Sequence, residues 1–343
     1  MEPQFYNHQQ PFHLEAGGLL PEITIAYHTW GKLTAAGDNV IWICHALTAN
    51  ANAADWWKGL VGDGCAFDSA KNFIVCANII GSCYGSTGPL SINPETGKAY
   101  LHSFPAITIR DIVAAHEVLR QHLGIKKIAL LAGGSLGGYQ VLEWSLLQPA
   151  IIEKQFLIVT SAKETAWGIA IHTAQRMAIE TDERFANEKH DGGEKGLATA
   201  RAIGMLTYRN YKSFVQTQTD DDKNKLSDFR ASSYIKYQAK KLTQRFNAYS
   251  YYTLINAMDT HNIARNREGN VKDVLQRIIQ PTLVIGITGD VLCPVEETAF
   301  LASNLADTKF VAIDSLYGHD GFLVEVSLIT KHIKEWQEKL EVV

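Results

Sequence analysis

A serine flanked by glycines is the residue of this chain best placed to do chemistry. The segment Gly133-Gly134-Ser135-Leu136-Gly137 is a G-x-S-x-G pattern between an apolar, strand-like run and a run with apolar residues at helical spacing. A strand and a helix converge at such a turn, so the positions two before and two after the serine need glycine, which has no Cβ to collide. The pattern therefore predicts that the Ser135 hydroxyl is a nucleophile for an acyl carbon.

A glycine-rich turn of a nucleotide-binding fold, with an idle serine, is the alternative interpretation. The dinucleotide fingerprint opens the first strand–helix unit and is followed by an acidic residue about 20 positions later. Here the motif begins well into the chain. The position favours the nucleophile.

A serine nucleophile needs a base, and the base needs a carboxylate that orients it. In the α/β-hydrolase fold both follow the serine, the acid before the histidine, each in a loop after a later strand. Asp290 follows the apolar run 283–287, and His319 follows the run 310–313. We therefore expect a catalytic triad of Ser135, His319 and Asp290.

Other residues compete for these roles. Asp307 and Asp314 are alternative acids, and Asp290 could simply be a turn aspartate. His45 is a tempting second base, but its place at the end of a strand-like run favours a structural hydrogen bond.

The tetrahedral oxyanion of acyl transfer needs two preorganised N–H donors. One expected donor is the backbone amide of Leu136, which directly follows the nucleophile at a helix N-terminus. The other is the amide of Leu47, in the loop after the strand-like run 40–44.

The elements that position these residues alternate along the chain. The expected strands are 40–44, 73–77, 128–131, 156–160, 283–287 and 310–313, and the clearest helices are 109–123 and 327–340. This alternation predicts an α/β-hydrolase fold, with a mostly parallel sheet flanked by helices. No convincing strand occurs between 163 and 270. We therefore expect a core domain of residues 1–162 and 271–343 and an inserted helical lid domain of residues 163–270.

Composition narrows the class of protein. The chain has 343 residues, 46% of them hydrophobic, which is enough for one large α/β domain and a smaller appendage. The net charge of -4 gives no reason to expect nucleic acid as a partner. Without a long apolar run or a signal-peptide pattern at the N-terminus, we expect no membrane contact and a cytoplasmic protein. Five cysteines without a C-x-x-C pair predict reduced thiols and no metal site.

Several longer strings resemble the homoserine O-acetyltransferase family, whose members activate homoserine for methionine biosynthesis. The strings are CHALTA (44–49), NIIGSCYGSTGPLSINPETGKAY (78–100), FPAITIRD (104–111), GGSLGGYQVLEW (133–144) and YGHDGFL (317–323). The resemblance runs from about residue 13 to residue 325 and includes the expected lid. The run G-S-T-G-P with the S-I-N-P-x-T-G-K-x-Y string after it is specific to this family.

The resemblance implies a ping-pong reaction. Ser135 would take the acetyl group from acetyl-CoA and pass it to the side-chain hydroxyl of L-homoserine, while His319 moves the proton and Asp290 holds the imidazole. Arg201 would bind the α-carboxylate, Asp320 would receive the α-ammonium, and Tyr208 would help to close the pocket. The resemblance further implies substrates that are small molecules, no tightly bound cofactor, and a homodimer formed through the lid helices.

Some positions depart from the family's usual residues. Leu136 replaces a frequent Met, Ala49 a Gly, and Gly289 and Cys293 replace Ser and Phe near the acid. The first two leave the donating amides intact. A succinyl-CoA-dependent or serine-directed O-acyltransferase stays open as an alternative, as does a serine esterase on the same scaffold. A noncatalytic ligand-binding relative is a further alternative, but this chain retains all three triad residues.

Overall fold

The central sheet is built from short apolar strands. The computed structural model describes residues 2–341. In spatial order the strands are β1 (Gln4–His8), β4 (Ile23–Trp30), β8 (Phe73–Ala77), β5 (Val40–Cys44), β11 (Ile128–Gly134), β12 (Gln155–Ile158), β13 (Thr282–Thr288) and β14 (Thr308–Asp314). All pairings from β8 to β14 are parallel, whereas β4 pairs antiparallel with both β1 and β8. The expected mostly parallel sheet is confirmed, and the antiparallel edge is an addition that the sequence did not predict.

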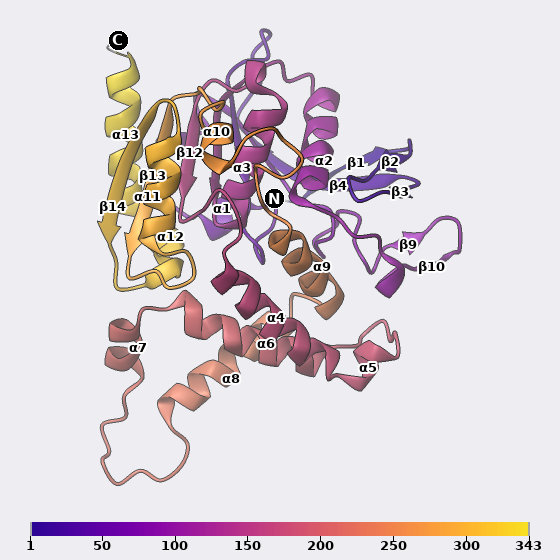
Figure 1. Cartoon of the computed structure of the whole chain (residues 1–343), viewed down its shortest axis with the longest axis vertical. Coiled ribbons are helices and arrows are strands. Elements are labelled where there is room, and N and C mark those ends of the chain that lie inside the picture. Colours follow the sequence, from indigo (N-terminus) through magenta and orange to yellow (C-terminus); the bar gives the residue numbers. More distant parts are fainter. Residues whose placement is uncertain (1, 342–343) are drawn as a thin grey trace.

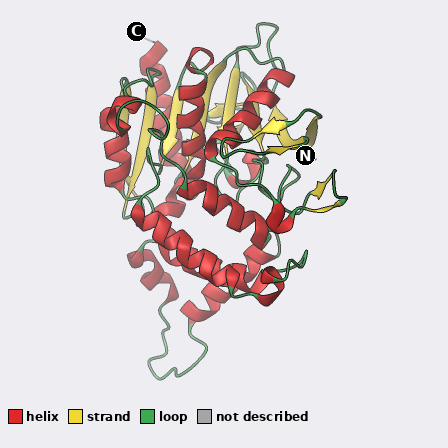
Figure 2. Ribbon diagram, turned by 45° about the vertical axis from the view of Figure 1, so that its right-hand side comes forward, coloured by secondary structure: helices red, strands yellow, loops and turns green. Residues whose placement is uncertain are grey.

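Helices cover both faces of the sheet (Figure 2). The core helices are α1 (Ala53–Trp56), α2 (Ile109–His122), α3 (Leu136–Leu147), α10 (Val271–Leu275), α11 (Val295–Asn304), α12 (Gly321–Val324) and α13 (Val326–Glu341). Strand β5 shows why the strands are apolar at every position: Trp42 belongs to the hydrophobic cluster under α2 and α3, and its neighbours Ile41 and Ile43 belong to the cluster under α13. A strand covered on both faces has no solvent side, so its sequence does not alternate.

Short elements complete the core. They are the two-residue strands β2 (Phe12–His13), β3 (Leu19–Leu20), β6 (Val61–Gly62), β7 (Phe67–Asp68), β9 (Ile92–Asn93) and β10 (Lys98–Ala99), and the 3-10 turns Leu101–Ser103, Pro149–Ile151 and Gly318–Asp320.

All five cysteines are free thiols. No helix within residues 2–341 combines the length and the apolar character needed to cross a membrane.

A helical segment is inserted between β12 and β13. It contains α4 (Ala166–Glu180), α5 (Glu183–Ala186), α6 (Glu194–Tyr208), α7 (Tyr211–Gln218), α8 (Arg230–Thr243) and α9 (Ala248–Asp259), and none of the strands found in residues 2–341. Its two ends meet at a bridge between Lys163 and Asn262. Figure 1 shows α4 to α8 gathered beyond the end of the sheet toward which the β14 arrowhead points. We call residues 163–270 the insertion; its status as a separate domain stays a prediction.

Candidate active site

Ser135 lies at the tip of a sharp turn from β11 to α3. Its φ of 53° falls in the left-handed region, which is costly for a residue with a side chain. A Cβ on Gly133 would collide with the carbonyl oxygen of Gly137, and a Cβ on Gly137 would collide with that of Cys44. The Ser135 amide also donates to the carbonyl of Ile158 at 3.0 Å. The glycines thus permit the close approach that holds the serine hydroxyl out at the end of the sheet.

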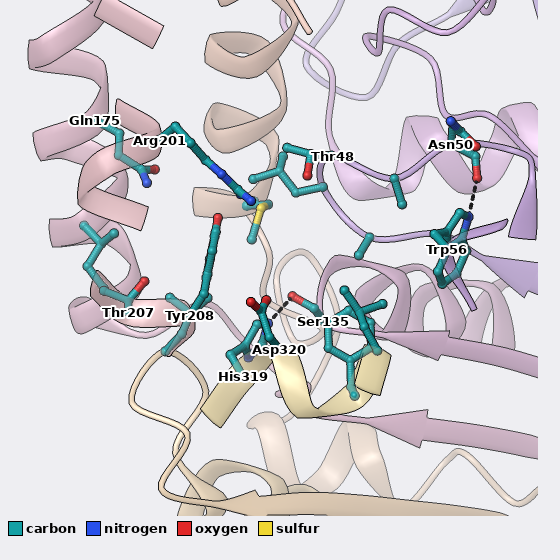
Figure 3. Close-up of a pocket in the computed structure, with 18 of the residues that line it drawn as sticks. Thr48, Asn50, Trp56, Ser135, Gln175, Arg201, Thr207, Tyr208, His319 and Asp320 are labelled. Atoms are coloured by element: carbon teal, nitrogen blue, oxygen red, sulfur yellow. Dashed lines mark hydrogen bonds between the residues drawn. The ribbon is translucent and has the colours of Figure 1, made fainter. Parts of the chain in front are cut away.

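The structure brings together the three residues expected to form the triad. His319 Nε2 lies 3.0 Å from Ser135 Oγ, and His319 Nδ1 lies 2.7 Å from Asp290 Oδ2 (Figure 3 shows the first contact). The other Asp290 oxygen accepts from the backbone amides of Leu292 and Cys293, at 2.9 Å each. With the imidazole neutral, its Nδ1–H donates to the carboxylate and the serine hydroxyl donates to Nε2. This is the geometry of a base positioned to take the serine proton.

Asp290 and His319 are buried, and their charges influence one another. Burial disfavours the imidazolium form of His319, but the facing Asp290 carboxylate and the hydrogen bond to it prevail. The pKa of His319 is therefore raised above its ordinary value. An imidazole of this kind stabilises the proton that it receives during the reaction.

The competing residues lie in other arrangements. Asp314 accepts a hydrogen bond from the Thr288 hydroxyl at 2.7 Å, whereas Asp290 is the carboxylate that contacts His319. His45 contacts the Ala46 carbonyl through Nδ1 at 2.9 Å and accepts from the Ile79 amide through Nε2 at 3.1 Å. Burial lowers the pKa of His45 to about 4. Both His45 nitrogens are thus occupied in tying the loop after β5 to the end of β8.

Asp307 directly precedes β14, and its backbone carbonyl accepts from the Thr282 amide at 3.0 Å. That amide stands at the first residue of β13. Parallel strands place their carboxyl ends, and not these starting residues, beside Ser135. The full length of strand β14 therefore lies between Asp307 and the loop that bears His319.

The two expected oxyanion donors flank the serine. Leu136 is the first residue of α3, and Leu47 lies in a turn closed by the Ala49 amide, which donates to the Ala46 carbonyl at 3.0 Å. Among the backbone hydrogen bonds outside regular elements of residues 2–341, neither the Leu47 nor the Leu136 amide donates to a protein carbonyl. Both amides are therefore available to an oxyanion.

A residue of the insertion holds this turn. Arg245 Nη1 donates to the Thr48 carbonyl at 2.6 Å and contacts the Tyr84 hydroxyl at 2.5 Å. Thr48 directly follows Leu47 in the turn. The insertion therefore contacts the backbone that presents one of the candidate oxyanion donors.

A cavity of about 320 Å³ opens in front of Ser135, between the sheet and the insertion. Its walls combine residues of the core (Ala46, Leu47, Thr48, Ala49, Asn50, Asp55, Trp56, Tyr84, Ser135, Leu292, His319, Asp320, Phe322 and Leu323) with residues of the insertion (Ile171, His172, Gln175, Arg201, Thr207, Tyr208, Arg245 and Met258). Figure 3 shows Arg201, Tyr208 and Asp320 around the same space as Ser135 and His319. All three residues expected to bind the acceptor therefore line the cavity onto which Ser135 opens.

Arg201 enters this cavity without a protein counter-ion. Its guanidinium carbon lies 5.1 Å from the centre of the Tyr208 ring, and its buried Nε has no hydrogen-bond partner. No carboxylate of residues 2–341 lies within salt-bridge distance of it. A half-buried guanidinium without a carboxylate partner favours an anionic ligand.

Asp320 offers the opposite charge, but it already has a partner. Its carboxylate lies 3.2 Å from Arg209 Nε. Burial raises the pKa of Asp320, although the charges of Arg209 and His319 act in the opposite direction. An ammonium group at Asp320 would therefore share the carboxylate with Arg209.

The sequence did not reveal a second histidine at the cavity. His172 Nδ1 lies 2.6 Å from Asp259 Oδ1, and Arg176 Nη1 lies 2.7 Å from the other carboxylate oxygen. His172 and Asp259 belong to α4 and α9, 87 positions apart, and no motif joins them. Within residues 2–341, no group of three or more His, Cys, Asp or Glu residues is arranged to hold a metal ion.

Fold and triad together place the chain in a class. The family model for the alpha/beta hydrolase fold matches residues 39–326. A solved homoserine O-acetyltransferase from Bacillus anthracis superposes with a TM-score of 0.91 at 22% identity, covering 98% of both chains. Esterase E22 superposes with a TM-score of 0.90 at 23% identity, covering 98% of this chain and 99% of that one. At these identities the two structures support the fold, and the expected fold class is confirmed.

Sequence identity is much higher to a curated homoserine O-acetyltransferase, that of Trichormus variabilis. The two are 45% identical over 342 residues, which cover 99% of this chain and 95% of the relative. This chain belongs to the homoserine O-acetyltransferase family. The resemblance drawn from the sequence strings is confirmed, and the chain is an enzyme of the alpha/beta hydrolase fold.

Proposed function

We propose that this chain transfers the acetyl group of acetyl-CoA to the side-chain hydroxyl of L-homoserine, through an acetyl-Ser135 intermediate, in methionine biosynthesis. The unpaired Arg201 guanidinium in the cavity of the nucleophile carries the proposal. A hydrolase of simple esters needs no cation in the cavity beside its serine, whereas an enzyme that binds an amino-acid acceptor does. The name shared by the relatives supports the same reaction.

In the first half-reaction, His319 takes the proton of Ser135 while Oγ attacks the thioester carbon. The amides of Leu47 and Leu136 hold the oxyanion, in which the negative charge develops. The carbon–sulfur bond then breaks, and His319 returns the proton to the departing CoA thiolate. The raised pKa of His319 makes it able to hold that proton between the two steps.

In the second half-reaction, homoserine occupies the place that CoA has left. Its carboxylate binds Arg201, with Tyr208 beside the guanidinium, and its ammonium contacts Asp320. His319 then takes the proton of the acceptor hydroxyl as that oxygen attacks the acetyl carbon. The bond between the acetyl carbon and Ser135 Oγ then breaks, and His319 returns the proton to Ser135. Holding the hydroxyl next to the acetyl-enzyme gives it a high effective concentration, so it competes successfully with water.

The remaining partners follow from the same proposal. Acetyl-CoA acts as a co-substrate, and the enzyme has no tightly bound cofactor. Exposed apolar side chains on the inserted helices, namely Met177, Leu206, Tyr211, Val215 and Tyr237, support a homodimer through this segment. We further propose that the enzyme works in the cytoplasm.

One experiment tests the proposed function against its alternatives. The purified protein is incubated with acetyl-CoA or succinyl-CoA, together with homoserine, serine or no acceptor, and the products are identified by mass. We expect O-acetylhomoserine as the main product, formed faster than acetate is released. Succinylated or serine-derived products would identify a related acyltransferase, and release of acetate alone would identify an esterase.

A further inference from the structure

A second, much smaller cavity also borders Ser135. Its volume is about 20 Å³, room for a single water molecule or methyl group. It shares five lining residues with the large cavity, namely Ser135, His172, Met258, Leu292 and His319, but Arg201, Tyr208 and Asp320 do not line it. The walls that belong to the small cavity alone are Tyr139, Val159, Ser161, Glu164, Thr165 and Cys293.

Several polar groups in these walls already have protein partners. The Tyr139 hydroxyl donates to Glu164 Oε2 at 3.0 Å, and the Thr165 amide donates to Oε1 at 2.9 Å. The Ser161 hydroxyl donates to the Lys163 carbonyl at 2.8 Å. A buried water is held by polar groups that lack other partners. These walls suit an apolar group of the same size better.

The chemistry at Ser135 indicates which group of the reaction intermediate fits the small cavity. The tetrahedral carbon of the intermediate carries four groups: Ser135 Oγ, the oxyanion, the leaving or attacking atom, and the acyl chain. An oxyanion held by the amides of Leu47 and Leu136 lies at the large cavity, which Leu47 lines, and the CoA or acceptor that bears the leaving or attacking atom fits only this cavity of about 320 Å³. The acyl chain is the remaining group, and the small cavity is the other space that borders Ser135.

We propose that this small cavity binds the methyl group of the acetyl-enzyme and that its size makes the enzyme select acetyl over longer acyl groups. The inference rests on the proposed function and names the feature that selects its donor. In the step concerned, the bond between Ser135 Oγ and the acyl carbon forms and the carbon–sulfur bond of the donor breaks. The serine proton passes through His319 to the thiol that leaves.

Charge reinforces size in excluding a succinyl group. A succinyl chain would carry its carboxylate into walls that include the Glu164 carboxylate. The His172 ring in the same wall is already paired with Asp259 at 2.6 Å. A third carboxylate in this buried space would lack a cation of its own, which is strongly unfavourable.

Cys293 offers a clean test because it lines the small cavity and not the large one. Cys293→Ala removes the sulfur from the wall, and the backbone amide that donates to Asp290 remains. The measurement is the rate of acyl-enzyme formation from acetyl-, propionyl-, butyryl- and succinyl-CoA, followed by thiol release and by the mass of the protein. One methylene changes such rates by about 10- to 200-fold. We expect the wild type to disfavour propionyl by a factor in this range and Cys293→Ala to reduce that factor about tenfold.

Two further variants frame the result. Ile171→Val alters the large cavity alone and should leave the ratio of propionyl to acetyl rates unchanged. Cys293→Leu fills the small cavity and should slow acetylation of Ser135, with thermal unfolding used to show that the variant is folded. Should Ile171→Val shift the ratio while Cys293→Ala leaves it unchanged, the acyl chain lies in the large cavity and the inference is wrong.

The inference and the proposed function fail in different ways. Normal acetylation of homoserine with a chain-length preference that Cys293→Ala does not change would overturn the inference alone. If the wild type acetylates no acceptor, the proposed function fails, and p-nitrophenyl acetate and propionate then replace the CoA donors. The same shift toward propionate in Cys293→Ala would support the small cavity as the acyl site, and an unchanged ratio would overturn it.

Discussion

Replacing Arg201 by alanine should separate the two half-reactions. The guanidinium has no carboxylate partner among residues 2–341, so its removal strands no buried charge. The main interaction lost within the protein is the cation–π contact with the Tyr208 ring, which contributes about 0.5–1 kcal/mol at a solvent-accessible site. The variant should therefore fold and should form the acetyl-enzyme at the wild-type rate.

Transfer to homoserine should suffer instead. A charge-assisted hydrogen bond contributes about 1.5–3 kcal/mol, which corresponds to a decrease of about 10- to 150-fold in the rate of transfer at low homoserine concentration. Arg201→Lys keeps the charge but loses the two-pronged geometry, so it should fall between the wild type and the alanine variant. In both variants a larger share of the acetyl-enzyme should be lost to water.

Single-turnover kinetics measure both steps. Formation of the acetyl-enzyme is followed by release of CoA, and its decay is followed with and without homoserine. Lys195→Ala, an exposed position on the same helix, is the matched control and should leave both steps unchanged. Equal losses in the two half-reactions of Arg201→Ala would refute the reasoning, because they would indicate structural damage or a contact with the donor.

Three other outcomes are expected. Ser135→Ala should abolish acetyl transfer without unfolding the protein, and no acetyl mass should appear on the variant after incubation with acetyl-CoA. The rate of acetylation should rise with pH as His319 loses its proton, with a midpoint above 6.5 because its pKa is raised; His319→Ala should flatten this profile, and flattening by His45→Ala instead would mean that the base is misassigned. Burial lowers the pKa of both His45 and His116 to about 4, so between about pH 6.5 and 4 the unfolded chain binds protons that the folded chain does not. The free energy of unfolding should therefore decrease as the pH is lowered from 6.5 to 4, by roughly 2–3 kcal/mol per histidine. A melting temperature that stays constant from pH 7 to 4 would contradict the lowered pKa values of these two histidines.

The sequence predicted the parallel half of the sheet because those strands are buried on both faces. Their apolar residues are consecutive, so 40–44 and 73–77 match β5 and β8 at both ends. Strand β4 escaped notice because its sequence, ITIAYHTW, mixes threonine, tyrosine and histidine with apolar residues. Its antiparallel pairing to the edge strand β1 is a long-range choice that no local pattern reveals.

The ends of some strands differ for local reasons. Strand β11 continues through Gly133 and Gly134, which a sequence pattern assigns to the turn. Strand β12 ends at Ile158, earlier than expected, because Val159 takes a φ of 45° and leaves the extended conformation. Both differences lie beside Ser135, where the backbone is shaped for the nucleophile.

Residues of the candidate site could be predicted where a short stretch of sequence marks them, and not where they depend on contacts between distant segments. Ser135, Asp290 and His319 each follow a strand-like run, so motif and fold class together select them. Arg201 came from family resemblance, since nothing in its helix marks it. The pair of His172 and Asp259 depends on the packing of two inserted helices and has no sequence signature.

The hydrogen bond from Arg245 to the Thr48 carbonyl has a consequence for engineering this scaffold. Exchanging the insertion for that of a relative is a route to new acceptor substrates, because the inserted helices supply part of the wall of the large cavity. Here the exchanged part also braces the turn that bears Leu47. A transplanted insertion without a hydrogen-bond donor at the position of Arg245 would supply a new acceptor site but would leave the turn that bears Leu47 without this support. Chimeras of this enzyme should therefore be cut so that Arg245 stays with the core it supports.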